Sequence, residues 1–96
     1  MIRSFGDPAT EDLYHGRQTN RVRRFQQAIV PVALRKLDMG AAAYELVDLR
    51  VPPGNQLELP KVDRNGQHSI RVNDQYRVCF RWTSAGAEDV EIVDYH

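Results

Sequence analysis

Residues 67–83 constrain the fold more than any other part of the chain, because they predict a β-hairpin with a defined register. Apolar and polar residues alternate on both sides of Asn73, Asp74 and Gln75, whose residue types favour a tight turn. A three-residue turn predicts that one face of this hairpin carries apolar or aromatic pairs: Val72 with Tyr76, Ile70 with Val78, and His68 with Phe80. We expect that face to be buried against helices.

The opposite face of the predicted hairpin is basic. The same register pairs Arg71 with Arg77, and it places Arg81 further along the same face. Side-by-side arginines repel one another unless an anion lies across them, so this face is the candidate site. The alternative is a solvated strand face, which is where strand arginines usually lie.

The N-terminal half predicts a strand followed by two helices. Residues 2–5 form a short expected strand, after which Asp7 as N-cap and Pro8 in the first turn open a helix that Gly16 closes. A second helix begins after Thr19 or Asn20. Its apolar stripe has three-and-four spacing: Val22, Phe25, Ile29, Val32, Ala33 and Leu37. Pro31 interrupts this pattern and predicts a kink near residues 27–31, or two abutting helices.

The remaining segments complete an α+β domain. We expect a helical turn within residues 41–49, a loop at 51–55, a short strand at 56–59 and a last strand at 89–95. A chain of 96 residues is long enough for one core, so residues 1–96 are predicted to form a single domain. The N-terminal strand and two helices would pack on one face of a mainly antiparallel sheet.

Charge is segregated along the chain although the formal net charge is zero. Between Leu13 and Leu37 there are six basic residues and no acid: Arg17, Arg21, Arg23, Arg24, Arg35 and Lys36. From Thr83 onward there are four acids and no Lys or Arg. The basic run is interpreted either as an RNA contact or as a solvated helix face, and its bias favours RNA. No apolar run predicts a leader or a membrane span, so we expect a cytoplasmic protein. With one cysteine and no His/Cys cluster, neither a disulfide, a metal nor another cofactor is expected.

Several motifs together resemble the HigB branch of the RelE/ParE toxin superfamily. They are residues 48–55, Lys61, Asp63-Arg64, the block from Gly66 to Trp82, and the closing Asp89-Val90-Glu91-Ile92-Val93-Asp94-Tyr95-His96. The start of the chain, residues 1–5, agrees as well, whereas residues 6–39 match mainly in helical pattern. The resemblance implies a RelE-like fold and the toxin component of a type II toxin-antitoxin system. It also implies ribosome-dependent, metal-independent cleavage of messenger RNA and inhibition of translation.

The resemblance also implies roles for particular residues. His96 and Tyr95 would transfer protons or position a base, Asp94 would orient a neighbour, and Arg71, Arg77 and Lys61 would bind the scissile phosphate. Some relatives carry a second catalytic histidine in the strand before the lysine, where this chain has Glu58, so the identity of the general base stays open. Ribosome or RNA contacts are expected from a wider basic set: Arg81, Arg64, Arg21, Arg23, Arg24, Arg35 and Lys36.

Other interpretations of these residues and of the fold stay open. His68 shares the apolar face and is assigned to packing, and the hairpin register places no base beside Cys79 or Ser69 for nucleophilic catalysis. The same fold could bind DNA gyrase without chemistry, as ParE-like toxins do, or could be a catalytically silent antitoxin-binding member. The expected partners are a HigA-like helix-turn-helix antitoxin, which alone would contact operator DNA, and the ribosome with its messenger RNA.

Overall fold

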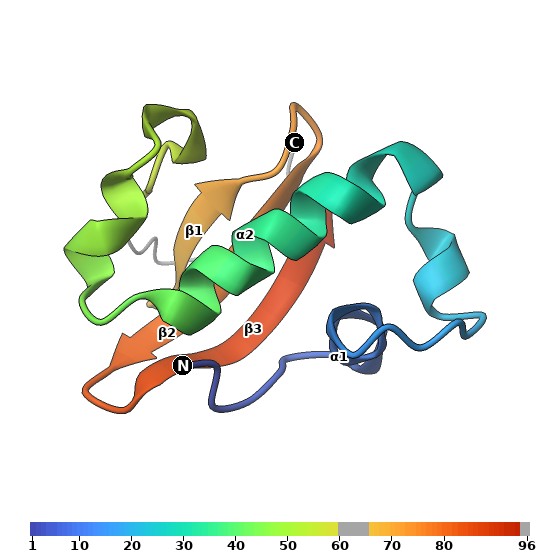
Figure 1. Ribbon diagram of the computed structural model, residues 1–96, viewed down its shortest axis with the longest axis horizontal. Helices are drawn as coiled ribbons and strands as arrows, with labels where there is room; N and C mark the ends of the chain where they lie inside the picture. Colours follow the sequence, from blue (N-terminus) through green and yellow to red (C-terminus); the bar gives the residue numbers. More distant parts are fainter. Residues whose placement is uncertain (60–65, 95–96) are drawn as a thin grey trace.

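A three-stranded antiparallel sheet forms the centre of the computed structural model, which describes residues 1–59 and 66–94 (Figure 1). Its strands are β1 (His68–Arg71), β2 (Tyr76–Thr83) and β3 (Gly86–Asp94), in the order β1-β2-β3. The predicted hairpin register is confirmed, with Ile70 opposite Val78 and Arg71 opposite Arg77. The Asn73 side chain closes the turn, because its Oδ1 accepts hydrogen bonds from the backbone N–H groups of Gln75 and Tyr76.

Both edges of the sheet carry short segments joined by isolated bridges. Ile2 and Phe5 make parallel bridges to Ala87 and Val90 of β3, so two isolated bridges stand in place of the expected N-terminal strand. At the other edge, Glu58 makes one antiparallel bridge to Ser69 of β1, in place of the expected strand at 56–59. A register shift between Cys79 and Arg81 interrupts the β2–β3 ladder.

The first helix, α1 (Pro8–Tyr14), begins and ends as predicted. The Asp7 carboxylate accepts a hydrogen bond from the Thr10 backbone N–H, and Pro8 occupies the first turn. Gly16 follows with a positive φ of 74°, the left-handed conformation that favours glycine after a helix. The Thr10 hydroxyl then ties α1 to the sheet by accepting a hydrogen bond from the Ile92 backbone N–H.

The second helix of the structure is shorter than the helix that the apolar pattern predicts. Two 3-10 turns, η1 (Val22–Arg24) and η2 (Gln27–Ile29), precede α2 (Val30–Ala42). Pro31 lies in the first turn of α2, where its missing N–H has no intrahelical partner to lose, so it opens this helix instead of kinking it. The expected alternative of abutting helices is therefore nearer to the structure than a kink.

Two further 3-10 turns follow α2. They are η3 (Leu46–Arg50), which falls close to the expected helical turn, and η4 (Pro53–Asn55) in the expected loop. No helix within the described residues is long and apolar enough to cross a membrane.

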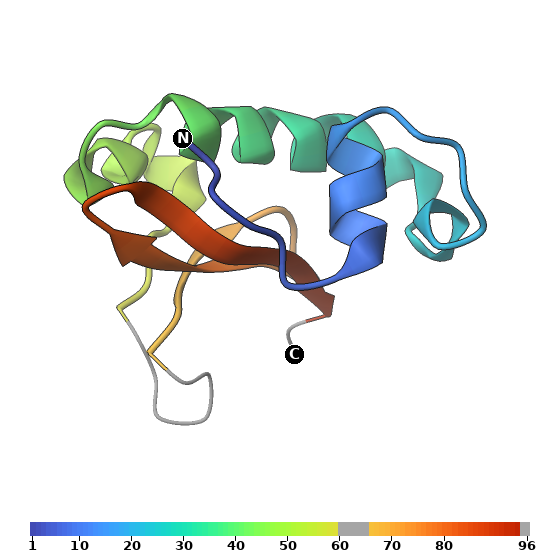
Figure 2. The same ribbon diagram turned by 90° about the horizontal axis from the view of Figure 1, so that it is seen from below.

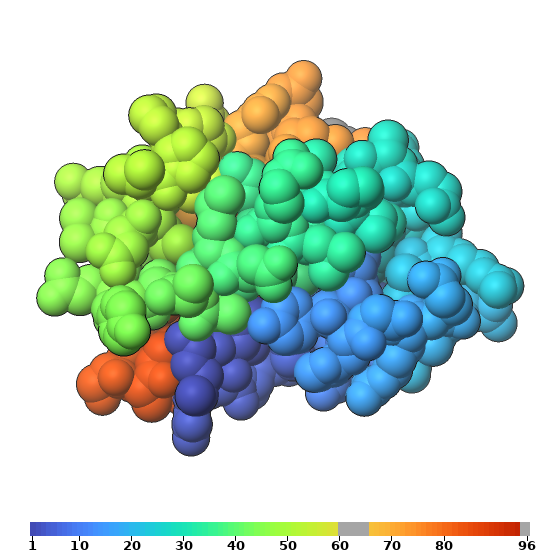
Figure 3. All heavy atoms as spheres, in the orientation of Figure 1, coloured from blue at the N-terminus to red at the C-terminus, as the bar shows by residue number. Residues whose placement is uncertain are grey.

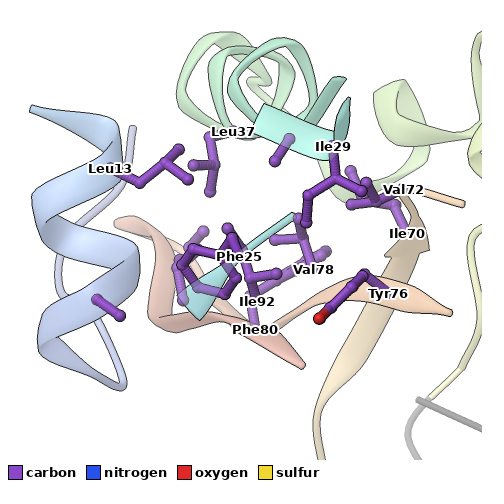
Figure 4. Close-up of a cluster of buried hydrophobic side chains, with 14 of the residues drawn as sticks. Leu13, Phe25, Ile29, Leu37, Ile70, Val72, Tyr76, Val78, Phe80 and Ile92 are labelled. Atoms are coloured by element: carbon purple, nitrogen blue, oxygen red, sulfur yellow. The ribbon is translucent and has the colours of Figure 1, made fainter. Parts of the chain in front are cut away.

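The core lies between α2 and one face of the sheet (Figure 2). The sheet residues assigned to that face, Ile70, Val72, Val78 and Phe80, are all buried. Figure 4 shows Leu37 and Ile29 facing these strands, with Leu13 of α1 beside them. In Figure 3, α2 crosses the centre of the covered face, with α1 and η1 on one side and η3 and η4 on the other.

Candidate functional site

Three predicted site residues lie at one end of the sheet. Arg77 of β2 lies between Arg71 of β1 and Val93 of β3. Its neighbour Tyr76 lies opposite Asp94 of β3. This end, where β1 and β3 stop and β2 starts, therefore carries Arg71 and Arg77 on one face of the sheet, whereas Asp94, opposite Tyr76, lies on the other face. The predicted residues Lys61, Arg64, Tyr95 and His96 lie outside the described residues.

Acids of the chain itself accompany the arginines of this face, which corrects the expectation that they repel one another until an outside anion binds. Arg71 makes a short ion pair with Asp74, and the Arg81 Nε lies 3.0 Å from the Asp89 carboxylate. Asp74 is fully exposed and Arg71 is about one-third exposed, so water screens their pairing. The guanidinium of Arg71 remains within reach of a ligand.

Arg77 differs from its two neighbours because it is buried, with 7% of its surface exposed. Its Nε donates to the Ser69 hydroxyl at 2.8 Å, and a terminal nitrogen donates to the backbone carbonyls of Gln56 and Ser69. The Glu58 carboxylate lies 3.7 Å from its Nε. The expectation of a solvent-facing arginine is wrong for Arg77.

Glu58 reaches this face from the segment beside β1. Its backbone exchanges both N–H and C=O hydrogen bonds with Ser69, at 2.9 and 3.3 Å. Its carboxylate accepts a further hydrogen bond from the Ser69 hydroxyl at 3.4 Å, and the side chain is 38% exposed. Glu58 is thus both accessible to a substrate and tied to Ser69.

A cationic cluster extends from α2 toward Arg71. The Lys36 ammonium donates to the fully buried Asn55 amide oxygen at 2.5 Å. Burial lowers the pKa of Lys36, and the positive charges of Arg35 and Arg71 lower it further. Arg35 and Arg71 therefore each repel the Lys36 ammonium, and an anion beside Lys36 would relieve that repulsion.

The basic run before α2 is partly neutralised by an acid just outside the acid-free interval. Asp12, with a side chain 4% exposed, lies 3.3 Å from Arg17 and 3.0 Å from Arg21 and accepts a hydrogen bond from Thr19. Burial would raise the pKa of Asp12, but these three hydrogen bonds outweigh it and leave the pKa below its usual value. Arg23 and Arg24 are exposed and make local contacts.

His68 fits its assignment to packing. Its ring stacks on that of Phe80 at a centroid distance of 6.0 Å, and burial lowers its pKa. Cys79 is buried with 1% of its surface exposed. Across residues 1–59 and 66–94, His, Cys, Asp and Glu side chains form no group of three or more that could hold a metal ion.

Comparison with known proteins identifies the family. A model described as the RelE-like toxin of type II toxin-antitoxin system HigB matches residues 3–96. The chain belongs to the HigB-like toxins. Toxin HigB-1 of Vibrio cholerae is 37% identical over 87 residues, which cover 91% of this chain and 90% of that toxin. An uncharacterized Haemophilus influenzae protein is 49% identical over 51 residues, about half of each chain.

Family membership confirms the resemblance noted in the sequence motifs. As a HigB-like toxin of a type II system, the chain has an antitoxin as its implied partner. Residues to which the sequence analysis gave no role in the site also shape it: Ser69, Asn55 and Asp12. The expected hairpin places Ser69 diagonally to Arg77, so their contact could have been predicted from the register. The contacts of Asn55 and Asp12 follow no helical or strand spacing.

Proposed function

We propose that this HigB-like toxin is a ribosome-dependent endoribonuclease that cleaves messenger RNA and thereby inhibits translation. The observation that carries the proposal is the placement of Arg71, Arg77 and Asp94 at the end of the sheet that immediately precedes Tyr95-His96 in the chain. Cleavage of RNA needs cationic donors next to proton-transfer groups, and these residue types supply both.

The chemistry is an internal transesterification that needs no metal ion. The ribose 2′-oxygen forms a bond to the adjacent phosphorus while the bond from phosphorus to the 5′-oxygen breaks. One group accepts the proton of the 2′-hydroxyl, and another donates a proton to the departing 5′-oxygen. Negative charge accumulates on the phosphate oxygens in between, where Arg or Lys donors stabilise it.

In this scheme the proton-transfer groups are His96 and Tyr95, with Glu58 as the candidate general base. Asp94 orients a neighbouring group, and its carboxylate already accepts a hydrogen bond from the Gln75 side chain at 3.1 Å. Of the paired Arg71 and Arg77, Arg71 is the one whose guanidinium a phosphate can reach, and Lys61 joins it in this proposal.

The remaining cations would hold the toxin on ribosomal RNA. The cluster of Arg35, Lys36 and Arg71 extends the site along α2. The further proposed RNA contacts are Arg21, Arg23, Arg24, Arg64 and Arg81. Because phosphate contacts release counterions, binding should weaken steeply as salt rises. We further propose that a HigA-like helix-turn-helix antitoxin neutralises the toxin, either by covering or distorting the face of Arg71 and Arg77 or by clamping the helices against ribosome entry.

The test is cleavage of a defined message by purified toxin, with and without ribosomes. Wild-type toxin should cut the message only when ribosomes are present, and Arg71→Ala should lower the rate by roughly 10²-fold. Arg3→Ala is the matched control, because Arg3 is exposed and lies beside Ala87 at the start of β3. This control should cleave at the wild-type rate.

Two results would count against the proposal. Equal cleavage of naked RNA would show that the reaction does not depend on the ribosome. Wild-type activity of Arg71→Ala would show that Arg71 does not stabilise the scissile phosphate. Growth arrest with intact messages and loss of DNA supercoiling would instead support the gyrase-binding alternative.

A further inference from the structure

Ser69 connects three parts of the candidate site. Its hydroxyl accepts from the Arg77 Nε at 2.8 Å and donates to the Glu58 carboxylate at 3.4 Å. Its carbonyl accepts from both the Glu58 backbone N–H and the Arg77 guanidinium. Ser69 itself is 4% exposed, so water has little access to its side of these bonds.

The contacts of Arg77 are those of an arginine that holds backbone in place. The guanidinium binds two carbonyl oxygens and one hydroxyl of the chain itself, and its side chain is 8% exposed. One of those carbonyls belongs to Gln56, a non-glycine residue in the left-handed region at φ 45°. That conformation is sparsely populated and needs support from its surroundings, which the bond from Arg77 supplies.

We propose that Arg77, acting through Ser69, is the positioning residue for Glu58. Arg77 anchors the turn at Gln56, Ser69 holds the backbone of Glu58 at the edge of β1, and both orient the carboxylate toward the sheet end that carries Arg71. Arg77 then contributes to RNA cleavage without contacting the RNA. This inference rests on the proposed function, and it reassigns Arg77 from phosphate binding.

The physical basis is preorganisation. A base on a single bridged residue lacks the continuous ladder of hydrogen bonds that fixes a residue within a regular strand, so side-chain bonds such as these help to fix its direction. A displacement of about 1 Å at a reacting group can reduce a rate by roughly 10²-fold. Lysine cannot replace Arg77, because an ammonium lacks the planar fork that reaches Ser69 and Gln56 together.

The test uses Ser69→Ala and Arg77→Lys, with Ser4→Ala as the matched control. Ser4 also accepts a hydrogen bond through its hydroxyl, from the Asp89 backbone N–H, at the opposite edge of the sheet. Hydrogen exchange of the free protein should show about 10-fold faster exchange at the Glu58 amide in Ser69→Ala and Arg77→Lys. Amides of the β2–β3 ladder should stay protected in all three proteins.

The second measurement is single-turnover cleavage on ribosomes carrying a defined message. Ser69→Ala and Arg77→Lys should each lower the maximal rate by roughly 10- to 100-fold, while the toxin concentration giving half-maximal rate stays within about 2-fold of wild type. If Arg77 instead binds phosphate, Ser69→Ala should keep the wild-type maximal rate. Arg77→Lys should then raise the toxin concentration that gives half-maximal rate and change its dependence on salt.

The two arms separate this inference from the proposed function. If wild-type toxin cleaves no message, the proposed function fails, whereas faster Glu58 exchange in both variants still supports the positioning by Arg77 and Ser69. If wild-type toxin is active and Ser69→Ala matches it in exchange and in rate, the positioning role is overturned.

Discussion

Replacing Asn55 with alanine should destabilise the fold more than any change at an exposed asparagine. Asn55 is fully buried, and its amide nitrogen donates to the Leu49 carbonyl at 3.1 Å and to the Val51 carbonyl at 3.4 Å. Its amide oxygen accepts from the Lys36 ammonium at 2.5 Å. The side chain therefore joins α2 to both η3 and η4.

The magnitude follows from what the substitution leaves behind. A buried Leu49 carbonyl without a donor costs about 1–3 kcal/mol. Lys36 is only partly buried, so water replaces its lost acceptor at about 0.5–1 kcal/mol. The sum is a loss of roughly 2–4 kcal/mol, a large part of the ~5–14 kcal/mol expected for a domain of this length.

The assay is urea unfolding of the purified protein, in which the midpoint should fall while the slope stays constant. The control is Asn20→Ala, since the exposed Asn20 also accepts a hydrogen bond from a basic side chain, that of Arg23. Its loss should be below about 0.5 kcal/mol. If the two variants unfolded at the same midpoint, the buried amide would not be the link between α2 and the following turns.

Three further predictions address the proposed catalytic residues and two polar contacts of α1, those of Asp12 and Thr10. His96→Gln should lower message cleavage by roughly 10²- to 10⁴-fold with unchanged stability, whereas His68→Phe should retain activity; cleavage assays and thermal melts distinguish them. The pKa of Asp12 is lower in the folded protein than in the unfolded chain, so the ionised carboxylate stabilises the fold. That contribution is complete above the pKa of the unfolded chain and is lost as the pH falls through the pKa of the folded protein. Asp12→Asn should therefore flatten the stability loss below pH ~4 in acid titrations. Thr10→Val should cost about 1–3 kcal/mol by urea unfolding, because the Ile92 N–H would lose its acceptor in the core.

The hairpin could be predicted from the sequence because its determinants are local. Alternation fixes which face of each strand is apolar, and a turn of Asn73, Asp74 and Gln75 fixes the pairing of Arg71 with Arg77. The start of α1 was equally local, since Asp7 and Pro8 act within one turn. The family resemblance then supplied candidate site residues, which neither alternation nor capping could supply.

What the sequence pattern missed depends on distant partners. Arg77 is buried because the carbonyl of Gln56, 21 residues earlier, comes within reach of its guanidinium, and strand alternation carries no information about that contact. Asp12 binds Arg17 and Arg21 across a turn with no helical spacing. The position of Pro31 at the start of α2 was missed for another reason, because the apolar spacing continues through the two 3-10 turns before it.

The covered edges of the sheet restrict how other chains can associate with this toxin. Exposed edge strands invite pairing with further strands, which leads to aggregation or domain swapping. Here residues 1–6 occupy the outer side of β3 through four backbone hydrogen bonds, and Glu58 occupies that of β1 through two. An incoming strand would have to displace one of these segments first. Strand addition is thereby disfavoured at the positions that these segments occupy.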